Sequence, residues 1–359
     1  MTHIHFTDLI QVLGIPPLQQ TGNVVVDTIL TDSRRLLLGE GSLFVAISSA
    51  HKNANDFVLP LYQRGVKAFI LDREPTLALL SEMPDASIIQ VPDALTALQQ
   101  LAAWKRHLYA YPVIGITGSN GKTIVKEWLY QLLNDRYHIV RSPKSYNSQV
   151  GVPLSVWAMQ PHHTLGIFEA GISQKGEMNR LQPMIDPNIG VLTFMGEAHA
   201  EGFRSMEEKI REKLQLFRTA HYLIYASDDP RVEQVVQHFR HTVNPSLQLF
   251  SWGHQPTASL QVLHQEQKDD TSIIHLRYQA DTLSLVIPFT DAASVFNVLT
   301  CCAVLLQMGQ SLVSIARQLH ELRPVEMRLE LKQGTNQCSV INDSYSADLN
   351  SLMIALDFL

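Results

Sequence analysis

Short apolar runs alternate with helically spaced apolar positions over the first hundred residues. The runs are rich in Val, Ile, Leu and Phe and predict strands at residues 24–29, 43–47, 68–71 and 87–91. Helical spacing falls between them, at 56–64 and 94–108. The pattern predicts a small α/β domain over residues 1–108. The Tyr111-Pro112 pair is a plausible boundary, because proline restricts its own backbone and that of the preceding residue.

From Val113 onward the pattern is strand followed by helix, which is typical of a mainly parallel sheet. Strands are predicted at 113–117, 137–141, 166–170, 190–194 and 222–226, with helices at 123–133, 205–219 and 231–239. Alternating positions at 272–278 and 283–289 predict antiparallel strands, and two helices follow at 292–308 and 312–322. We therefore expect a central α/β domain over residues 109–322.

A strand predicted at 338–342 opens a further unit, with one helix after it. One strand and one helix cannot bury a core of their own. We expect residues 323–359 to be the truncated beginning of a third α/β domain.

Composition narrows the classes of function. The chain of 359 residues carries 28 Lys+Arg against 34 Asp+Glu, a net charge of −6, whereas proteins that bind nucleic acid usually carry a basic excess. No apolar run approaches the roughly 18–20 residues that span a bilayer, and the N-terminus lacks the pattern of a signal peptide. Three cysteines without a CxxC pair fit a reduced cytoplasm. We expect a cytoplasmic protein with neither a nucleic-acid nor a membrane partner.

The strongest motif is Gly115-Ile-Thr-Gly-Ser-Asn-Gly-Lys-Thr123, which follows a predicted strand and opens a predicted helix. Glycines let the backbone wrap closely around phosphates, and the helix N-terminus faces the anion. Lys122 would reach the β- and γ-phosphates and the Thr123 hydroxyl would bind Mg²⁺. The strict Walker A spacing would need a glycine where Ile116 stands. We predict an ATP site at this loop, formed by Thr117, Gly118, Ser119, Asn120, Gly121, Lys122 and Thr123.

The motif and several later stretches resemble the Mur ligases of bacterial cell-wall synthesis. The form TGSNGKT is shared with that family and with folylpolyglutamate synthetases, and the Ile-Val-Lys-Glu that follows resembles the dipeptide-adding Mur ligases. The matches span nearly the whole chain, in the family's order. They are Thr31-Asp-Ser-Arg34, Gly41-Ser-Leu-Phe-Val-Ala46, Ser145-Tyr-Asn-Ser-Gln-Val-Gly-Val-Pro153, Phe168-Glu-Ala-Gly171, Glu197-Ala-His-Ala-Glu-Gly-Phe203 and Asn342-Asp-Ser-Tyr345.

The resemblance implies an ATP- and Mg²⁺-dependent amide ligase that works through an acyl phosphate. Its substrates would be UDP-N-acetylmuramoyl-tripeptide, held by residues 1–108, and D-alanyl-D-alanine. The third domain would be Rossmann-like, and some relatives continue into an alanine racemase domain. In this family the third domain carries the dipeptide site and closes over ATP. Residues 1–359 alone should therefore bind nucleotide weakly and make no product.

The predicted metal ligands, which are also predicted catalytic groups, are Glu169, His199 and Lys213. Lys122 is a further predicted catalytic group. Glu169 ends a predicted parallel strand, where ligands bind in open α/β sheets, and a carboxylate there suits Mg²⁺. His199 matches the family's second metal ligand. Lys213 lies at the edge of an apolar helix face, where partial burial favours the neutral amine, and it matches the lysine that carries a carbamate in this family. Lys209, four residues earlier, is the main rival.

Further contacts are carried over from the family. Asn297 matches the adenine contact, although Asp291-Ala-Ala-Ser294 replaces the usual Gly-Arg-His-Asn. The predicted substrate contacts are Asp32, Ser33, Arg34 and Asn147, and the nucleotide contacts at the hinge are Arg328 and Asp343. Asn147 could instead order its own loop.

Other functions stay open at this point. A sister Mur ligase or a folylpolyglutamate synthetase would share the loop, although the first domain and Asp-Ser-Tyr argue against the latter. A nucleotide switch or kinase-like protein would leave Glu169, His199 and Lys213 without a role. The last alternative is a non-catalytic fragment that binds a nucleotide or a UDP-sugar.

Overall fold

The computed structural model describes residues 3–22, 24–35, 39–48, 53–196, 202–325, 330–333 and 338–342. It forms two compact units. Unit 1 comprises Met1–Ala110 and Ser148–Pro161, and unit 2 comprises Tyr111–Asn147 and His162–Leu359. The predicted domain limits at 108 and 322 stay predictions. The two units follow spatial contacts instead, and they group residues 148–161 with unit 1.

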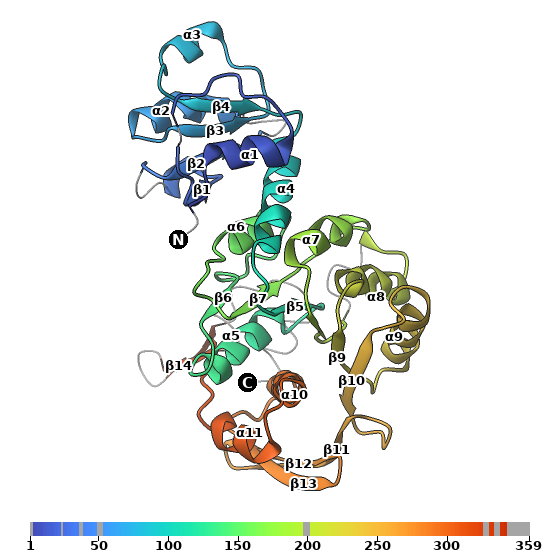
Figure 1. Cartoon of the computed structure of the whole chain (residues 1–359). Coiled ribbons are helices and arrows are strands. Elements are labelled where there is room, and N and C mark those ends of the chain that lie inside the picture. The colour runs from blue at the N-terminus through green and yellow to red at the C-terminus, as the bar shows by residue number, and fades with distance from the viewer. Residues whose placement is uncertain are drawn as a thin grey trace. The chain divides into compact units, whose positions relative to one another are not determined.

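Unit 1 is a four-stranded parallel sheet in the order β1-β2-β3-β4, with helices on both faces (Figure 1). Alternate residues of the strands enter separate cores. Leu43 and Val45 pack with Phe6 of α1 and with α4, whereas Phe44 packs with Leu61 of α2. The strands are β1 (Thr28–Leu30), β2 (Ser42–Ala46), β3 (Ala68–Leu71) and β4 (Ser87–Gln90). The helices are α1 (Phe6–Leu13), η1 (Ser33–Arg35), η2 (Ala54–Phe57), α2 (Val58–Gln63), α3 (Leu77–Ser81), α4 (Ala94–His107) and α6 (Gly151–Trp157).

Unit 2 is built on a nine-stranded mixed sheet in the order β13-β12-β11-β10-β9-β8-β5-β7-β6. Its strands from β6 to β11 pair in parallel, and β11, β12 and β13 pair antiparallel, which confirms the predicted α/β fold with a mainly parallel sheet. The strands are β5 (Val113–Thr117), β6 (Ile139–Arg141), β7 (Leu165–Glu169), β8 (Ile189–Leu192), β9 (Tyr222–Ala226), β10 (Gln248–Gly253), β11 (Leu260–Lys268), β12 (Thr271–Tyr278) and β13 (Asp281–Ile287).

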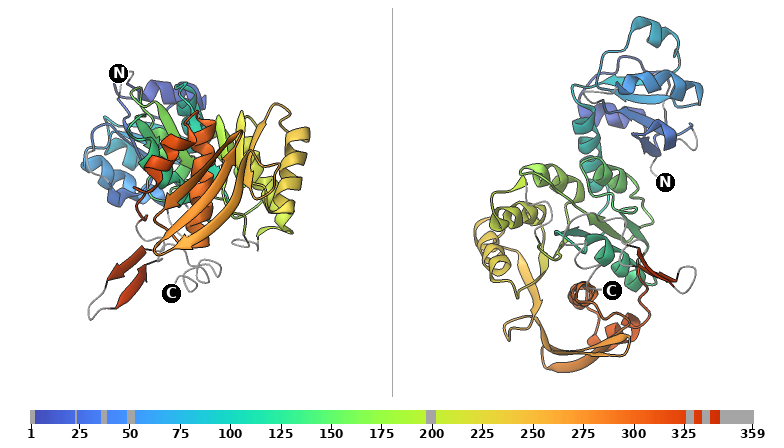
Figure 2. Two further views of the ribbon diagram at one scale, coloured as in Figure 1. Left: turned by 90° about the horizontal axis from the view of Figure 1, so that it is seen from below. Right: turned by 180° about the vertical axis from the view of Figure 1, so that it is seen from behind.

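Helices cover both faces of this sheet (Figures 1 and 2). On one face lie α5 (Lys122–Leu133), α10 (Ala292–Gln307) and α11 (Leu312–Leu319), which share one large apolar core with the strands. On the other lie α7 (Glu177–Ile185), α8 (Met206–Leu214) with η4 (Gln215–Phe217), and α9 (Pro230–Thr242). The carboxyl ends of β5, β7 and β8 therefore meet at one edge, which is where open α/β sheets bind ligands.

Two further strands, β14 (Glu330–Gln333) and β15 (Ser339–Asn342), form an antiparallel pair. The strand predicted at 338–342 is thus confirmed, whereas the helix expected after it lies outside the described residues. Within the described ranges no helix is long and apolar enough to cross a membrane.

Candidate nucleotide site

The phosphate loop connects β5 to α5, as its sequence predicts. Gly121 is the N-cap of α5 with φ +85°, a left-handed conformation that favours glycine. A Cβ atom at this position would lie 2.3 Å from Asn297 Oδ1, so the buried Asn297 packs directly against the loop. The loop therefore needs glycine here both for its backbone conformation and for the approach of α10.

The end of β8 holds the loop in place. Ser119 N–H and Asn120 N–H donate to Phe194 O at 2.8 and 3.3 Å, and the Thr193 hydroxyl donates to Asn120 O at 2.7 Å. The Ser119 hydroxyl donates to Gly196 O at 2.9 Å. Three of the four residues that follow β8 thus hold the loop: Thr193, Phe194 and Gly196.

Three lysine ammonium groups gather around the loop. Lys122 Nζ donates to Gly118 O at 2.9 Å and to Ser119 O at 2.7 Å, and Lys213 Nζ donates to the same Gly118 O at 3.0 Å. Lys209 Nζ donates to Gly196 O at 2.5 Å. The Lys122 ammonium beside a helix N-terminus is suited to a polyphosphate.

Lys213 is fully buried rather than at the edge of the apolar face, with 2% of its side chain exposed. Burial, reinforced by the charges of Lys122 and Lys209, lowers the pKa of Lys213 well below its usual value. Glu212 has the smallest effect and opposes this shift. Its carboxylate accepts Gly176 N–H at 2.9 Å at the start of α7. Lys209 is as deeply buried as Lys213, so it is more than a rival candidate: it fixes the segment that holds Ser119.

Glu169 ends β7 with its side chain completely buried beside the loop. The Thr123 hydroxyl donates to Glu169 Oε2 at 3.1 Å and lies 2.8 Å from Ser145 Oγ. The Asn147 amide lies 3.5 Å from the same Oε2. These are the hard oxygen donors that Mg²⁺ prefers, and the described residues contain no cluster of three His, Cys, Asp or Glu that would indicate an all-protein metal cage. The donors fit a Mg²⁺ ion that is shared with phosphate oxygens.

Lys126 is a member of this site that the sequence analysis missed. Its fully buried ammonium lies 3.0 Å from Glu169 Oε1 and donates to Ser142 O at 2.7 Å. The signal was available, because Lys126 follows Thr123 by three residues and so lies on the same face of α5. Thr193 and Glu212 were also missed, and each acts through backbone contacts that sequence spacing does not reveal.

The other predicted residues fall in several places. The Thr117 hydroxyl donates to Ala170 O at 2.9 Å and joins the ends of β5 and β7. The Asn147 backbone carbonyl accepts Gly171 N–H at 2.8 Å, and its contact with substrate stays a prediction. Predicted site residues that lie outside the described residues are His199, Arg328 and Asp343.

Asp32, Ser33 and Arg34 follow β1 in unit 1, at the carboxyl edge of its sheet. Arg34 donates through Nε and Nη2 to the two oxygens of Asp32 at 2.9 and 2.8 Å, and this pairing holds the pKa of the Asp32 carboxyl well below its usual value. Arg34 is largely exposed, with 87% of its side chain accessible. A phosphate group would have to share or replace the Asp32 contact.

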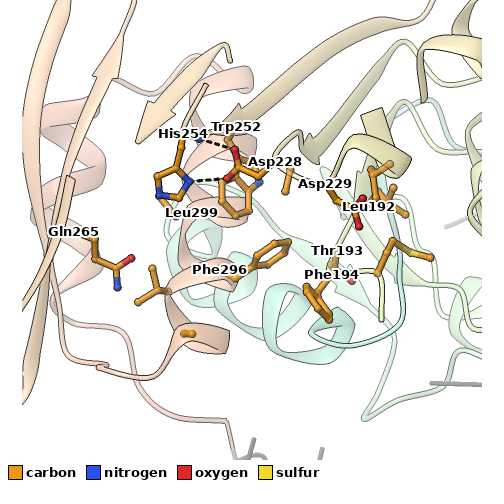
Figure 3. A pocket seen from close by; sticks show the side chains of 15 residues that line it. Leu192, Thr193, Phe194, Asp228, Asp229, Trp252, His254, Gln265, Phe296 and Leu299 are labelled. Atoms are coloured by element: carbon orange, nitrogen blue, oxygen red, sulfur yellow. Dashed lines mark hydrogen bonds and ion pairs between the residues drawn. The ribbon is translucent and has the colours of Figure 1, made fainter. Parts of the chain in front are cut away.

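An apolar pocket of about 380 Å³ lies at the carboxyl ends of β8, β9 and β10, against α10 (Figure 3). Its aromatic walls include Phe194, Phe296 and Trp252, with ring centroids 5.5 Å apart for the first pair and 4.6 Å for the second. His254 Nδ1 and Asp228 Oδ2 lie within hydrogen-bond distance, 2.7 Å apart, at its border. Phe194 lines the pocket, and its carbonyl also accepts the hydrogen bonds that anchor the phosphate loop. The aromatic walls of the pocket suit a flat apolar ring.

Fold and site together define a phosphate-loop α/β protein with a mainly parallel sheet and a cluster of oxygen donors beside the loop. The sequence profile of the Mur ligase middle domain matches residues 116–305, slightly more than half of the chain. The chain therefore belongs to the Mur ligase family.

Individual relatives agree with this assignment. The chain is 28% identical over 347 residues to the UDP-N-acetylmuramoyl-tripeptide–D-alanyl-D-alanine ligase of Bacillus subtilis, a match that covers 96% of this chain and 72% of the relative. Its fold is similar to crystal structure I of MurF from Acinetobacter baumannii, with a TM-score of 0.86 at 23% identity over 100% of this chain and 77% of that one. It is also similar to MurF ligase from Thermotoga maritima in complex with ADP, with a TM-score of 0.77 at 20% identity over 93% and 74% of the two chains.

Proposed function

We propose that this protein is the ATP-dependent ligase that joins D-alanyl-D-alanine to UDP-N-acetylmuramoyl-tripeptide in peptidoglycan precursor synthesis. The observation that carries the proposal is the hydrogen bond of Thr123 to the buried Glu169, beside a loop that Lys122 and Lys213 line. The family assignment and the function of the Bacillus subtilis relative support it.

The chemistry requires a carboxylate to become an electrophile. The tripeptide carboxylate attacks the γ-phosphate of ATP and gives an acyl phosphate and ADP. The dipeptide amine then attacks the acyl carbon and releases phosphate. Charge develops on phosphoryl oxygens in the first step, and the Lys122 ammonium and the N-terminus of α5 would stabilise it.

Thr123 and Glu169 are the proposed protein ligands of Mg²⁺, with His199 as a further one. The ion would neutralise the charge of the phosphates when bound. The Lys126 ammonium lies 3.0 Å from Oε1 of Glu169 and would balance the charge of the carboxylate, whose Oε2 accepts the Thr123 hydroxyl.

We further propose that Lys213 carries a carbamate in the active protein. Its amine would add to carbon dioxide and lose one proton. This addition requires a neutral amine, which burial at this position favours. The carbamate would turn a positive group into an anionic oxygen donor, which Mg²⁺ prefers.

Unit 1 is the proposed site of the UDP-linked substrate, with Asp32, Ser33 and Arg34 on the carboxyl edge of its sheet. Asn297 is proposed to contact adenine from its place against Gly121. The proposal includes a cytoplasmic location, where thiols such as the buried Cys301 and Cys302 stay reduced.

Amine-dependent phosphate release from ATP by the full-length protein tests the function. With UDP-N-acetylmuramoyl-tripeptide present, D-alanyl-D-alanine should stimulate release, and single amino acids should not. Stimulation by a single amino acid would point to a sister ligase, and stimulation by glutamate with a folate would point to a folylpolyglutamate synthetase.

A further inference from the structure

We propose that Thr193 is a positioning residue for nucleotide binding, whose hydroxyl sets the phosphate loop in the conformation that receives phosphate. The inference rests on the proposed ATP site. It concerns a residue outside the glycine–lysine motif, directly after the neighbouring strand β8.

Thr193 follows β8 and is buried, with 2% of its side chain exposed. Its backbone N–H donates to Thr117 O at 2.8 Å, which continues the pairing of β8 with β5. Its hydroxyl lies 2.7 Å from Asn120 O and 3.3 Å from Thr117 O. A hydroxyl carries one proton, so the shorter contact to Asn120 is the principal hydrogen bond.

This bond fixes the direction of the next N–H group. In a planar trans peptide the carbonyl and the following N–H point in opposite directions. The hydroxyl holds Asn120 O toward β8, so Gly121 N–H points away from β8, at the N-terminus of α5. N–H groups at such a helix start are the ones that bind phosphate.

The loop is shaped to accept this hydroxyl. A Cβ atom on Gly118 would lie 2.0 Å from Thr193 Oγ1. The hydroxyl therefore occupies the space that a side chain at position 118 would fill. Gly118 in the motif and Thr193, directly after β8, form a complementary pair.

The test substitutes Thr193→Val, which keeps the side-chain shape and removes the donor. Without the hydroxyl the Asn120 peptide can turn, so the receptive conformation becomes a minority. If its population falls to about one tenth, the apparent Kd for ADP rises roughly tenfold, because apparent affinity scales with the competent fraction. In the full-length protein the KM for ATP should rise by a similar factor, and kcat at saturating ATP should change less than about twofold.

Two further variants complete the design. Thr193→Ser retains the hydroxyl and should restore ADP affinity to near wild type. Thr300→Val is the matched control, since the buried Thr300 donates to Phe296 O at 2.9 Å within α10 and its loss should leave ADP affinity unchanged. If Thr193→Val does not fold, Thr193→Ala takes its place.

Calorimetry with ADP separates this inference from the proposed ATP site. Lys122→Ala should weaken ADP binding strongly, and wild-type affinity in that variant would contradict the ATP site itself. If Lys122→Ala loses binding while Thr193→Val keeps wild-type affinity, the inference about Thr193 is overturned. A Thr193→Val protein that melts earlier but binds ADP normally would give Thr193 a structural role, and would overturn it as well.

Discussion

Replacing Lys213 with methionine should stabilise the fold while removing activity. Lys213 is fully buried, and its ammonium shares the Gly118 carbonyl with Lys122. Burying an ammonium costs several kcal/mol even after relaxation. Methionine has a similar length and carries no charge, so Lys213→Met relieves that cost and the repulsion from its two lysine neighbours.

The magnitude follows from two opposing effects. The variant loses one hydrogen bond to Gly118 O, which contributes about 1.5–3 kcal/mol when the donor is charged. The relieved burial cost is larger, so we expect a net gain of about 2 kcal/mol. For a unit of this size that gain raises Tm by roughly 4–8 °C.

The effect should depend on pH in a defined direction. The pKa of Lys213 is lowered by burial first and by Lys122 and Lys209 next, from an ordinary value of 10.5. Between the lowered pKa and 10.5 the unfolded chain binds more protons than the folded protein, so wild-type stability rises with pH in that window. Below the window both states are protonated and the cost is complete. The advantage of Lys213→Met should therefore be largest at lower pH and shrink toward pH 10.5.

Denaturant unfolding of both proteins in CO₂-free buffer, from pH 7 to pH 10, measures this difference. A variant less stable than wild type at pH 7, or an advantage that does not change over the range, would refute the assignment of a destabilising buried amine. Lys209→Met is the companion variant, because Lys209 is equally buried but donates to Gly196 O and not to Gly118 O. It should disturb the loop anchor, so it should weaken ADP binding as well.

Other consequences can be measured separately. Lys122→Ala should reduce ATP turnover to background and leave the circular dichroism spectrum unchanged; near-normal turnover would remove the loop from the mechanism. Glu169→Gln should raise the Mg²⁺ concentration for half-maximal activity roughly tenfold or more, which a Mg²⁺ titration at fixed ATP measures; an unchanged titration would exclude Glu169 as a ligand. The double variant Ser33→Ala, Arg34→Ala should weaken binding of UDP-N-acetylmuramoyl-tripeptide in calorimetry without ATP, and equal affinity would count against these residues.

Much of the fold follows from local pattern. The parallel strands are continuous apolar runs because both faces of each sheet are covered, and such runs can be recognised without knowing their neighbours. The phosphate loop has a glycine spacing whose backbone reason is local, and Gly121 adopts the left-handed conformation that glycine favours. Strand β5 and helix α5 were accordingly predicted to within one residue.

The missed elements have identifiable causes. Helix α6 contains Gly151 and Pro153, which indicate a loop, yet Pro153 lies in the first turn, where a missing N–H costs nothing. Helix α7 contains Pro183 in its interior, and a proline inside a helical pattern usually argues against a helix. Strand β11 has exposed residues over most of its length, so it shows no alternation, and its ladder with β12 holds it in place.

The site was less predictable than the fold because its contacts depend on tertiary packing. A lysine on a polar helix such as α8 is normally solvated, and only the approach of the phosphate loop buries Lys213. The role of Lys126 depends on β7 bringing Glu169 within 3.0 Å of it. The assignment of residues 148–161 to unit 1 depends on packing against a domain that ended about forty residues earlier in the chain, since Trp157 joins the core with Leu98 and Leu101.

The most direct test of the central claim is the mass of the uridine-containing product. The full-length protein would be incubated with ATP, Mg²⁺, UDP-N-acetylmuramoyl-tripeptide and D-alanyl-D-alanine, and the products resolved by mass spectrometry. The proposed function predicts the tripeptide substrate plus the dipeptide less one water, formed one-for-one with ADP and phosphate. Unchanged tripeptide, or a product that carries a single amino acid, would contradict it.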